Sequence, residues 1–236
     1  MYLFVYFCDA INKKTMYKTV IFDLDGTLLD TLDDLAAATN WALRQHGFAE
    51  HSTDEVRMMV GNGVGKLIER AIPNGAVNPE YSQTLADFKG YYVQHCRDNT
   101  RPYKGIIELL QTLKAAGVKT GIVSNKLQPG VSELQREFFD GLIDVAVGER
   151  EGVRRKPAPD MVLTAMKELG ADKDSTIYVG DSDVDITTAR NCGLPCIAVT
   201  WGFRDRNFLL VHGASTMADT PQDIASFLLS CQGDNL

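Results

Sequence analysis

Near its N-terminus the chain reads Val20-Ile21-Phe22-Asp23-Leu24-Asp25-Gly26-Thr27, an unbroken apolar run followed by two carboxylates. A short apolar run without alternation is typical of a strand buried on both faces, as in the middle of a parallel sheet. Asp23 then lies at the carboxyl end of that strand, where open α/β sheets bind their ligands. Because packing gives no reason for two acids at this point, we interpret Asp23 and Asp25 as functional residues.

From about residue 100 onward, strand and helix signals alternate along the chain. Strands are predicted at 120–125, 176–181 and 195–200, with a weaker one at 144–147. Helices are predicted between and after them, at about 106–116, 129–138, 159–169, 184–192 and 221–230. This alternation predicts an α/β fold with a Rossmann-like parallel sheet and crossover helices.

Residues 31–99 carry helix signals only. Helices are predicted from Thr31 to Gly47 and at 56–60, 64–72 and 82–95. Thr31 followed by Asp34 matches a capping box at the start of the first helix. We expect these residues to form a separate all-helical unit, the helical insert (31–99), within an α/β core made of 16–30 and 100–236.

Composition limits the classes of function. A formal net charge of −7 argues against a broad nucleic-acid surface. No apolar run approaches the roughly 18–20 residues that span a bilayer, so we expect no membrane partner. The five cysteines are scattered and fit a reducing cytoplasm. Residues 1–15 match no signal peptide, and we expect an N-terminal extension or a misplaced start site there. A monomer or a homodimer is expected.

Polar residues follow the predicted strands. They are Asp23 and Asp25, Ser124 and Asn125, Lys156 within Arg155-Lys156-Pro157, and Asp181 and Asp185. Because the carboxyl ends of parallel strands lie at one edge of a sheet, we expect these residues to converge on one crevice.

Four carboxylates in one crevice repel one another unless a cation is present. Oxygen ligands in this number favour Mg²⁺, held together with waters and a substrate phosphate. We therefore predict a magnesium site formed by Asp23, Asp25, Asp181 and Asp185. Capping of a helix N-terminus is the alternative role for Asp181 and Asp185.

Four further residues are candidate phosphate ligands: Thr27, Ser124, Asn125 and Lys156. A lysine ammonium serves as a point charge for phosphate, and hydroxyl and backbone N–H groups bind phosphate oxygens. The alternatives are a surface lysine before a proline turn, and capping of the helix near Pro129 by Ser124 and Asn125.

In this order the motifs resemble those of the haloacid dehalogenase-like superfamily. The helical insert looks like the helical cap of the branch that contains phosphoglycolate phosphatases and β-phosphoglucomutases. Within that branch, Val60-Gly61-Asn62-Gly63-Val64-Gly65 and Ser124-Asn125-Lys126 are most similar to phosphoglycolate phosphatases. The resemblance implies a Mg²⁺-dependent phosphatase of small phosphorylated metabolites, with phosphoglycolate as the expected substrate.

The resemblance also implies residue roles. Asp23 is the nucleophile that forms an aspartyl-phosphate, and Asp25 protonates the leaving group and then activates water. We expect neighbouring carboxylates to raise the pKa of Asp25 so that it holds a proton near neutral pH. Mg²⁺ is held by Asp23, the backbone carbonyl of Asp25 and Asp181, with support from Asp185. Lys156 and Ser124 hold the phosphoryl oxygens.

The sequence leaves alternatives to the phosphatase function. A phosphosugar mutase or a pyrophosphatase on the same fold is the nearest alternative. A mutase must protect its phosphoenzyme from water, and this depends on closure of the cap, which the sequence does not show. A non-catalytic module is expected to lack Asp23, Asp25 or Asp181, and all three are present. Residues 61–66 fail the P-loop pattern, since Val60 replaces the first glycine and no strand precedes it. The four histidines show no zinc-ligand spacing.

Overall fold

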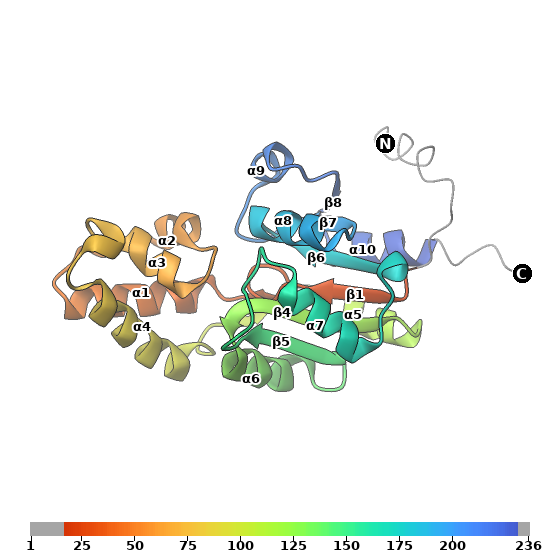
Figure 1. Cartoon of the computed structure of the whole chain (residues 1–236), viewed down its shortest axis with the longest axis horizontal. Helices are drawn as coiled ribbons and strands as arrows, with labels where there is room; N and C mark the ends of the chain where they lie inside the picture. The colour runs from red at the N-terminus through yellow and green to blue at the C-terminus, as the bar shows by residue number, and fades with distance from the viewer. Residues whose placement is uncertain (1–16, 231–236) are drawn as a thin grey trace, which may run out of the picture.

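The computed structural model describes residues 17–230, which form a three-layered α/β core with a group of helices at one end (Figure 1). The predicted extension at 1–15 lies outside the described residues. The core sheet consists of β1 (Thr19–Phe22), β4 (Lys119–Leu127), β5 (Val145–Glu149), β6 (Thr176–Gly180), β7 (Cys196–Val199) and β8 (Thr216–Ala218). Their order is β5-β4-β1-β6-β7-β8, and every neighbouring pair is parallel. The predicted α/β fold with a parallel sheet is confirmed.

Helices cover both faces of the sheet, which explains why Val20, Ile21 and Phe22 of β1 are all apolar. Val20 and Phe22 pack in the larger cluster with apolar residues of α5 (Ile106–Ala115), α6 (Gln128–Phe139) and α10 (Pro221–Leu229). Ile21 points to the other face and packs with residues of α7 (Asp160–Leu169) and α8 (Asp183–Cys192). Alternate residues of a strand point to opposite faces, so a central strand of this sheet needs apolar residues at every position.

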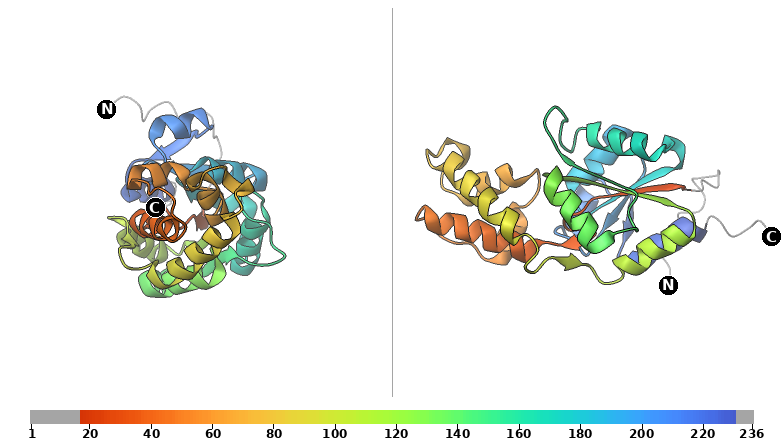
Figure 2. Two further views of the ribbon diagram at one scale, coloured as in Figure 1. Left: turned by 90° about the vertical axis from the view of Figure 1, so that its left-hand side faces the viewer. Right: turned by 90° about the horizontal axis from the view of Figure 1, so that it is seen from below.

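The helical insert contains α1 (Leu32–Gln45), α2 (Thr53–Met59), α3 (Val64–Ala71) and α4 (Tyr81–His95), with a short 3₁₀ turn η1 (Gly75–Val77). These helices lie side by side beyond one end of the sheet, both in Figure 1 and in the view from below in Figure 2. They share a hydrophobic cluster of their own, in which Val56, Leu67, Ile68 and Phe88 are buried. The insert therefore has its own small core.

Two short strands mark the connections between the core and the insert. β2 (Leu29–Asp30) and β3 (Arg101–Pro102) pair antiparallel, so the chain enters and leaves the insert side by side. The buried Asp34 carboxylate strengthens this junction, because it accepts hydrogen bonds from the backbone N–H groups of Asn99 (2.9 Å) and Thr100 (2.9 Å). The predicted capping box is wrong: Thr31 precedes α1 but makes no side-chain capping bond, and Asp34 is engaged at the junction instead.

Two further elements complete the described residues. The 3₁₀ turn η2 (Lys173–Ser175) precedes β6, and α9 (Arg206–Val211) lies between β7 and β8. Neither α9 nor β8 is among the elements predicted from the sequence. Between residues 17 and 230, no helix has the length and apolar content that crossing a membrane requires.

Candidate active site

The candidate site lies where the direction of the sheet connections reverses. β1 is paired with β4 on one side and with β6 on the other, and the chain continues outward from both partners. Asp23 directly follows β1, and Asp181 directly follows β6. Such a switch point opens a crevice at the carboxyl ends of the strands. The topology therefore places the two acids next to each other.

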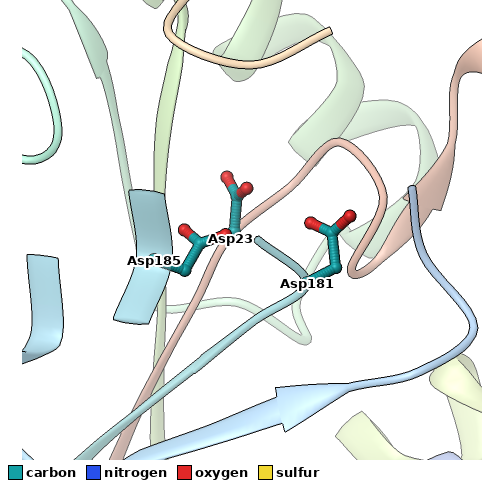
Figure 3. A group of neighbouring side chains, drawn as sticks. All are labelled: Asp23, Asp181 and Asp185. Carbon is teal, nitrogen blue, oxygen red and sulfur yellow. The ribbon is translucent and has the colours of Figure 1, made fainter. Parts of the chain in front are cut away.

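Asp185, in the first turn of α8, completes a group of three acids with Asp23 and Asp181 (Figure 3). One carboxylate oxygen from each lies within 4.8 Å of the others. Burial, followed by the negative charge of Asp185, raises the pKa of Asp23 well above its usual range. The same two causes raise the pKa of Asp181 to about 7. A cation between these oxygens relieves the repulsion, so the donor set fits a hard divalent ion such as Mg²⁺.

The three acids differ in how many donors they already bind. Both oxygens of Asp185 are occupied: Oδ1 by Lys156 (2.9 Å) and Oδ2 by the backbone N–H (3.1 Å) and hydroxyl (2.6 Å) of Ser182. Asp23 Oδ1 is bonded to Lys156 (2.7 Å) and to the N–H of Leu24 (2.7 Å), while within residues 17–230 its Oδ2 accepts no hydrogen bond. The free Oδ2 of Asp23 is the oxygen available for chemistry or for a ligand.

Lys156 links two of these carboxylates. It is buried, and its ammonium contacts Asp23, Asp185 and the Tyr178 hydroxyl (3.1 Å). Burial disfavours the charged form, but Asp185 and Asp23 outweigh it and raise the pKa of Lys156 above its ordinary value. Lys156 is thus a fixed cation beside Asp23, and the alternative of a solvated surface lysine is wrong.

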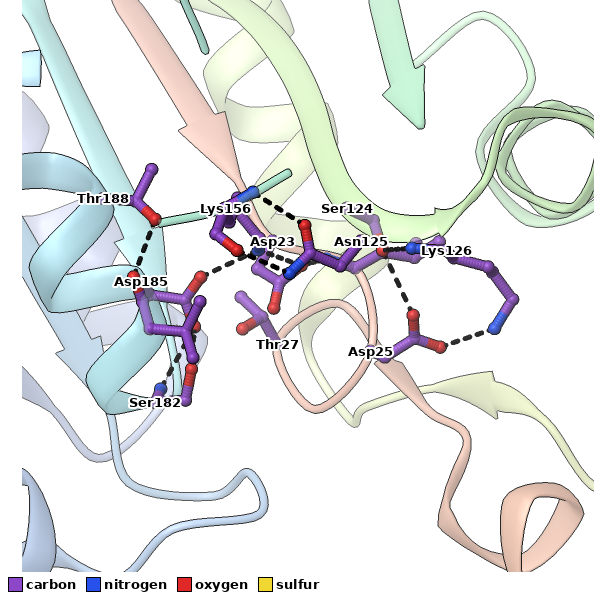
Figure 4. Close-up of polar contacts among 12 residues, drawn as sticks. Asp23, Asp25, Thr27, Ser124, Asn125, Lys126, Lys156, Ser182, Asp185 and Thr188 are labelled. Carbon is purple, nitrogen blue, oxygen red and sulfur yellow. Dashed lines mark hydrogen bonds and ion pairs between the residues drawn. The ribbon is translucent and has the colours of Figure 1, made fainter. Parts of the chain in front are cut away.

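The Asp25 side chain points away from Asp23 and Asp185 and toward Lys126 (Figure 4). Its Oδ1 accepts from Lys126 (2.7 Å) and its Oδ2 from the Ser124 hydroxyl (3.2 Å). Burial acts to raise the pKa of Asp25, but the charge and the hydrogen bond of Lys126 outweigh it and lower that pKa below its ordinary value. Our expectation that neighbouring carboxylates raise this pKa is therefore wrong for the free protein, because the nearest charged partner is a lysine. The side chain of Asp25 is also not part of the group formed by Asp23, Asp181 and Asp185.

Of the remaining predicted phosphate ligands, Ser124 and Asn125 line the crevice, whereas Thr27 does not. Ser124 lies in the crevice beside Asp25. The Asn125 side chain is used on the chain itself: its amide donates to the carbonyl of Lys156 (3.0 Å) and accepts from its N–H (2.9 Å). Thr27 is fully buried, and its hydroxyl donates to Asp181 (3.3 Å). The side chains of Asn125 and Thr27 thus position Lys156 and Asp181, and the role of these two residues as phosphate ligands stays a prediction.

The crevice is a cavity of about 100 Å³ that the core and the helical insert line together. The core contributes Asp23, Asp25, Ser124, Asn125, Lys126, Lys156, Asp181, Ser182, Val184, Phe203 and Arg204. The insert contributes Leu35, Tyr92, Leu67 and the segment from Val60 to Val64. Thr27 and Asp185 are not among the described residues that line it.

Sequence reasoning assigns no role to three of the lining residues. Lys126, whose side chain is 9% exposed, bonds Asp25 and also the Tyr92 hydroxyl of the insert (2.7 Å). Arg204 donates to backbone carbonyls of the insert. The available signal for Lys126 is its position directly after Ser124-Asn125. Tyr92 and Arg204 carry no local signal, because only the packing of the insert on the core brings them to the site.

Comparisons with known proteins agree with this geometry. Residues 20–199 match the family described as haloacid dehalogenase-like hydrolase. The chain is 32% identical to the N-acetylmuramic acid 6-phosphate phosphatase of Pseudomonas aeruginosa, over 92% of this chain and 96% of that protein. It is 31% identical to the phosphoglycolate phosphatase of Caulobacter vibrioides, over 92% and 94% of the two chains. A crystal structure from Lactobacillus delbrueckii subsp. bulgaricus, provisionally named a phosphoglycolate phosphatase, superposes with a TM-score of 0.87 at 39% identity, covering 90% of this chain and 98% of that one.

Proposed function

The chain belongs to the haloacid dehalogenase-like hydrolases and is a phosphoric monoester hydrolase, and from this premise we propose that it hydrolyses phosphoglycolate with Mg²⁺ as its cofactor. The observation that carries the proposal is the buried pairing of Asp23 with Lys156, which leaves one oxygen of Asp23 free in a side chain that lines the cavity. We further propose that the helical insert (31–99) acts as the cap of the core (16–30 and 100–236).

Asp23 is the nucleophile in this proposal. Its Oδ2 forms a bond to phosphorus while the bond between phosphorus and the leaving glycolate oxygen breaks, and an aspartyl-phosphate results. Lys156 fixes the other oxygen of Asp23 at 2.7 Å and so directs the free one. Together with Ser124, Lys156 also offers donors to the phosphoryl oxygens, where charge develops.

Asp25 is the general acid and then the general base in this proposal. It gives a proton to the leaving oxygen in the first step. In the second step it takes a proton from the water that attacks phosphorus, while the bond between phosphorus and the Asp23 oxygen breaks and phosphate is released. In the free protein Lys126 keeps Asp25 ionised, which suits the second step. Protonation for the first step requires a weaker contact between Lys126 and Asp25, and the carboxylate of the substrate provides this by competing for Lys126.

Asp23 and Asp181, together with the backbone carbonyl of Asp25, are the residues proposed to hold Mg²⁺, with support from Asp185. The ion would supply positive charge that offsets the repulsion between the carboxylate nucleophile and the phosphate dianion. Asp185 orients Lys156, and Thr27 orients Asp181 through its hydroxyl.

Two features support phosphoglycolate among phosphate esters. The cavity of about 100 Å³ is small beside the roughly 300–1,000 Å³ of pockets for drug-sized ligands, which favours a two-carbon acid over an amino sugar. The cavity is also lined by two lysines, the buried Lys156 for the phosphate and the partly buried Lys126 for a second anionic group. N-acetylmuramic acid 6-phosphate is the second candidate, because of the similarity to the Pseudomonas aeruginosa phosphatase.

The proposal includes a cytoplasmic location, which the free thiols of Cys96, Cys192 and Cys196 support. It also includes action as a monomer or homodimer on a small phosphorylated metabolite, with neither nucleic acid nor membrane as a partner.

The test is a panel of phosphate compounds incubated with the purified protein. Phosphate release is expected to be most efficient with phosphoglycolate, and it is expected to stop when a chelator removes Mg²⁺ and to return when Mg²⁺ is restored. The panel also holds N-acetylmuramic acid 6-phosphate, a hexose 1-phosphate and pyrophosphate, and an isomerised sugar phosphate would identify a mutase. Absence of phosphate release from phosphoglycolate rejects this substrate, and wild-type activity in Asp23→Asn rejects the mechanism.

A further inference from the structure

The loop that follows β7 contacts the active site and the helical insert at the same time. Trp201 donates its indole N–H to the carbonyl of Thr27 (3.0 Å), beside the site. The backbone N–H of Phe203 donates to Asp181 Oδ2 at 2.7 Å. A short hydrogen bond to a carboxylate oxygen fixes the direction of the other oxygen as well. The loop therefore sets the orientation of Asp181.

Gly202 shows how closely this loop approaches the site. A Cβ atom at Gly202 would overlap the carbonyl oxygen of Gly26 and the side chain of Asp181. Only glycine allows the backbone to come this near. A displacement of the loop therefore passes directly to Asp181.

The next residues of the loop reach into the helical insert. The Phe203 side chain is 8% exposed and packs in the hydrophobic cluster of the insert, although the residue belongs to the core chain. Arg204 donates to the carbonyls of Arg57 (2.8 Å) and Val60 (2.5 Å), at the C-terminal end of α2. One loop of four residues thus connects the insert to the carboxylate.

Arg204 is a buried charge, and it therefore depends on the hydrogen bonds that it donates to the insert. It is 8% exposed, its guanidinium lies 5.3 Å from the centre of the Phe208 ring, and its Nε has no hydrogen-bond partner within residues 17–230. A charged group removed from water needs its hydrogen-bond partners to remain folded in place. The position of α2 and the position of Arg204 consequently depend on each other.

We propose that Arg204 is a positioning residue that couples the seating of the helical insert to the orientation of Asp181. When the insert is seated, the end of α2 holds Arg204, and the adjacent Phe203 N–H holds the carboxylate in its ligating direction. This inference rests on the proposed role of Asp181 as a Mg²⁺ ligand. Groups that orient a metal ligand change metal affinity by about 10–100-fold when they are removed.

The experiment compares Arg204→Met and Arg204→Lys with the control Arg70→Met. Arg70 is an exposed arginine of the insert that donates to the carbonyls of Met59 (2.6 Å), Gly61 (3.2 Å) and, like Arg204, Val60 (3.4 Å). Unlike Arg204, it is not next in sequence to Phe203, whose N–H binds Asp181. Mg²⁺ affinity is measured by calorimetric titration of the protein alone. Hydrogen exchange of the peptide containing Phe203 is measured on metal-free protein, because local opening exposes that amide.

Arg204→Met is expected to weaken Mg²⁺ binding by about 10-fold and to speed exchange at Phe203, with partial recovery in Arg204→Lys. Arg70→Met is expected to leave both measurements at the wild-type level. The inference is overturned if Arg204→Met keeps wild-type Mg²⁺ affinity, or if Arg70→Met lowers it equally. If the wild-type protein binds no Mg²⁺, the proposed cofactor fails as well, whereas wild-type binding with an unaffected Arg204→Met overturns the inference alone.

Discussion

Replacement of Lys126 by methionine separates recognition of the substrate from the chemistry. Lys126 places a partly buried ammonium in the cavity, 2.7 Å from Asp25 and 2.7 Å from the Tyr92 hydroxyl. Methionine keeps most of the length and removes the charge. If Lys126 binds the carboxylate of phosphoglycolate, its loss removes one partner of a desolvated charge pair, which costs about 2–5 kcal/mol. The lower figure corresponds to a loss of about 30-fold in kcat/KM, at 1.4 kcal/mol for each factor of ten.

The assay is the ratio of kcat/KM for phosphoglycolate to that for p-nitrophenyl phosphate, which has no carboxylate. The ratio is expected to fall by about 30-fold or more in Lys126→Met and to stay closer to wild type in Lys126→Arg. Lys167→Met, an exposed lysine of α7, serves as the matched control. An equal loss on both substrates would refute the reasoning, because Lys126 would then act through Asp25 alone.

Three further predictions concern stability. Lys126 lowers the pKa of Asp25, and the stability that comes from a lowered pKa is present above the unfolded pKa and is lost as pH falls through the folded pKa. The loss of unfolding free energy in Lys126→Met is therefore expected to be smaller in acid than at neutral pH. Equal losses at neutral and acid pH in urea titrations would contradict this. Asp34→Ala is expected to lower the free energy of unfolding by about 3 kcal/mol and Tm by about 6–12 °C in thermal unfolding, since two junction N–H groups lose their acceptor; an unchanged Tm would contradict it. The hydrogen bond to Asp87 outweighs partial burial and raises the pKa of His46, so its stabilisation is full below the unfolded pKa and is lost as pH rises through the folded one. Because Asp87 is 32% exposed, His46→Gln is expected to cost only about 0.5 kcal/mol near pH 5.5 and less near pH 9, and a larger cost in alkali would refute the assignment.

The layered core is predictable from the sequence because its strands are buried on both faces. Val20-Ile21-Phe22 is apolar at every position, and the structure shows why, since Phe22 and Ile21 pack under helices on opposite faces. β2, β3 and β8 are not predictable in this way, because two or three residues carry no periodicity. α9 has one local signal, Asp205, whose side chain accepts from the N–H of Phe208 as an N-cap.

The positions of the acids are also predictable, because residues that follow parallel strands must meet at one edge. Asp23 and Asp181 illustrate this, since each directly follows a strand. The directions of side chains are not predictable from spacing. Asp25 lies two residues from Asp23 but pairs with Lys126, about one hundred residues away in the sequence. The use of Asn125 to hold the backbone of Lys156 likewise depends on how two loops pack.

Formation of an acyl phosphate on Asp23 is the most direct test of the proposed mechanism. Asp25→Asn removes the group that activates water, while p-nitrophenolate leaves without needing a proton. With p-nitrophenyl phosphate and Mg²⁺, this variant is expected to release about one nitrophenolate per active site in a rapid burst, the kinetic signature of a covalent intermediate. Peptide mapping of the acid-quenched protein is then expected to find the phosphate on Asp23. A burst with the phosphate on another residue, or slow release of nitrophenolate without any phosphorylated protein, would contradict the assignment of Asp23 as the nucleophile.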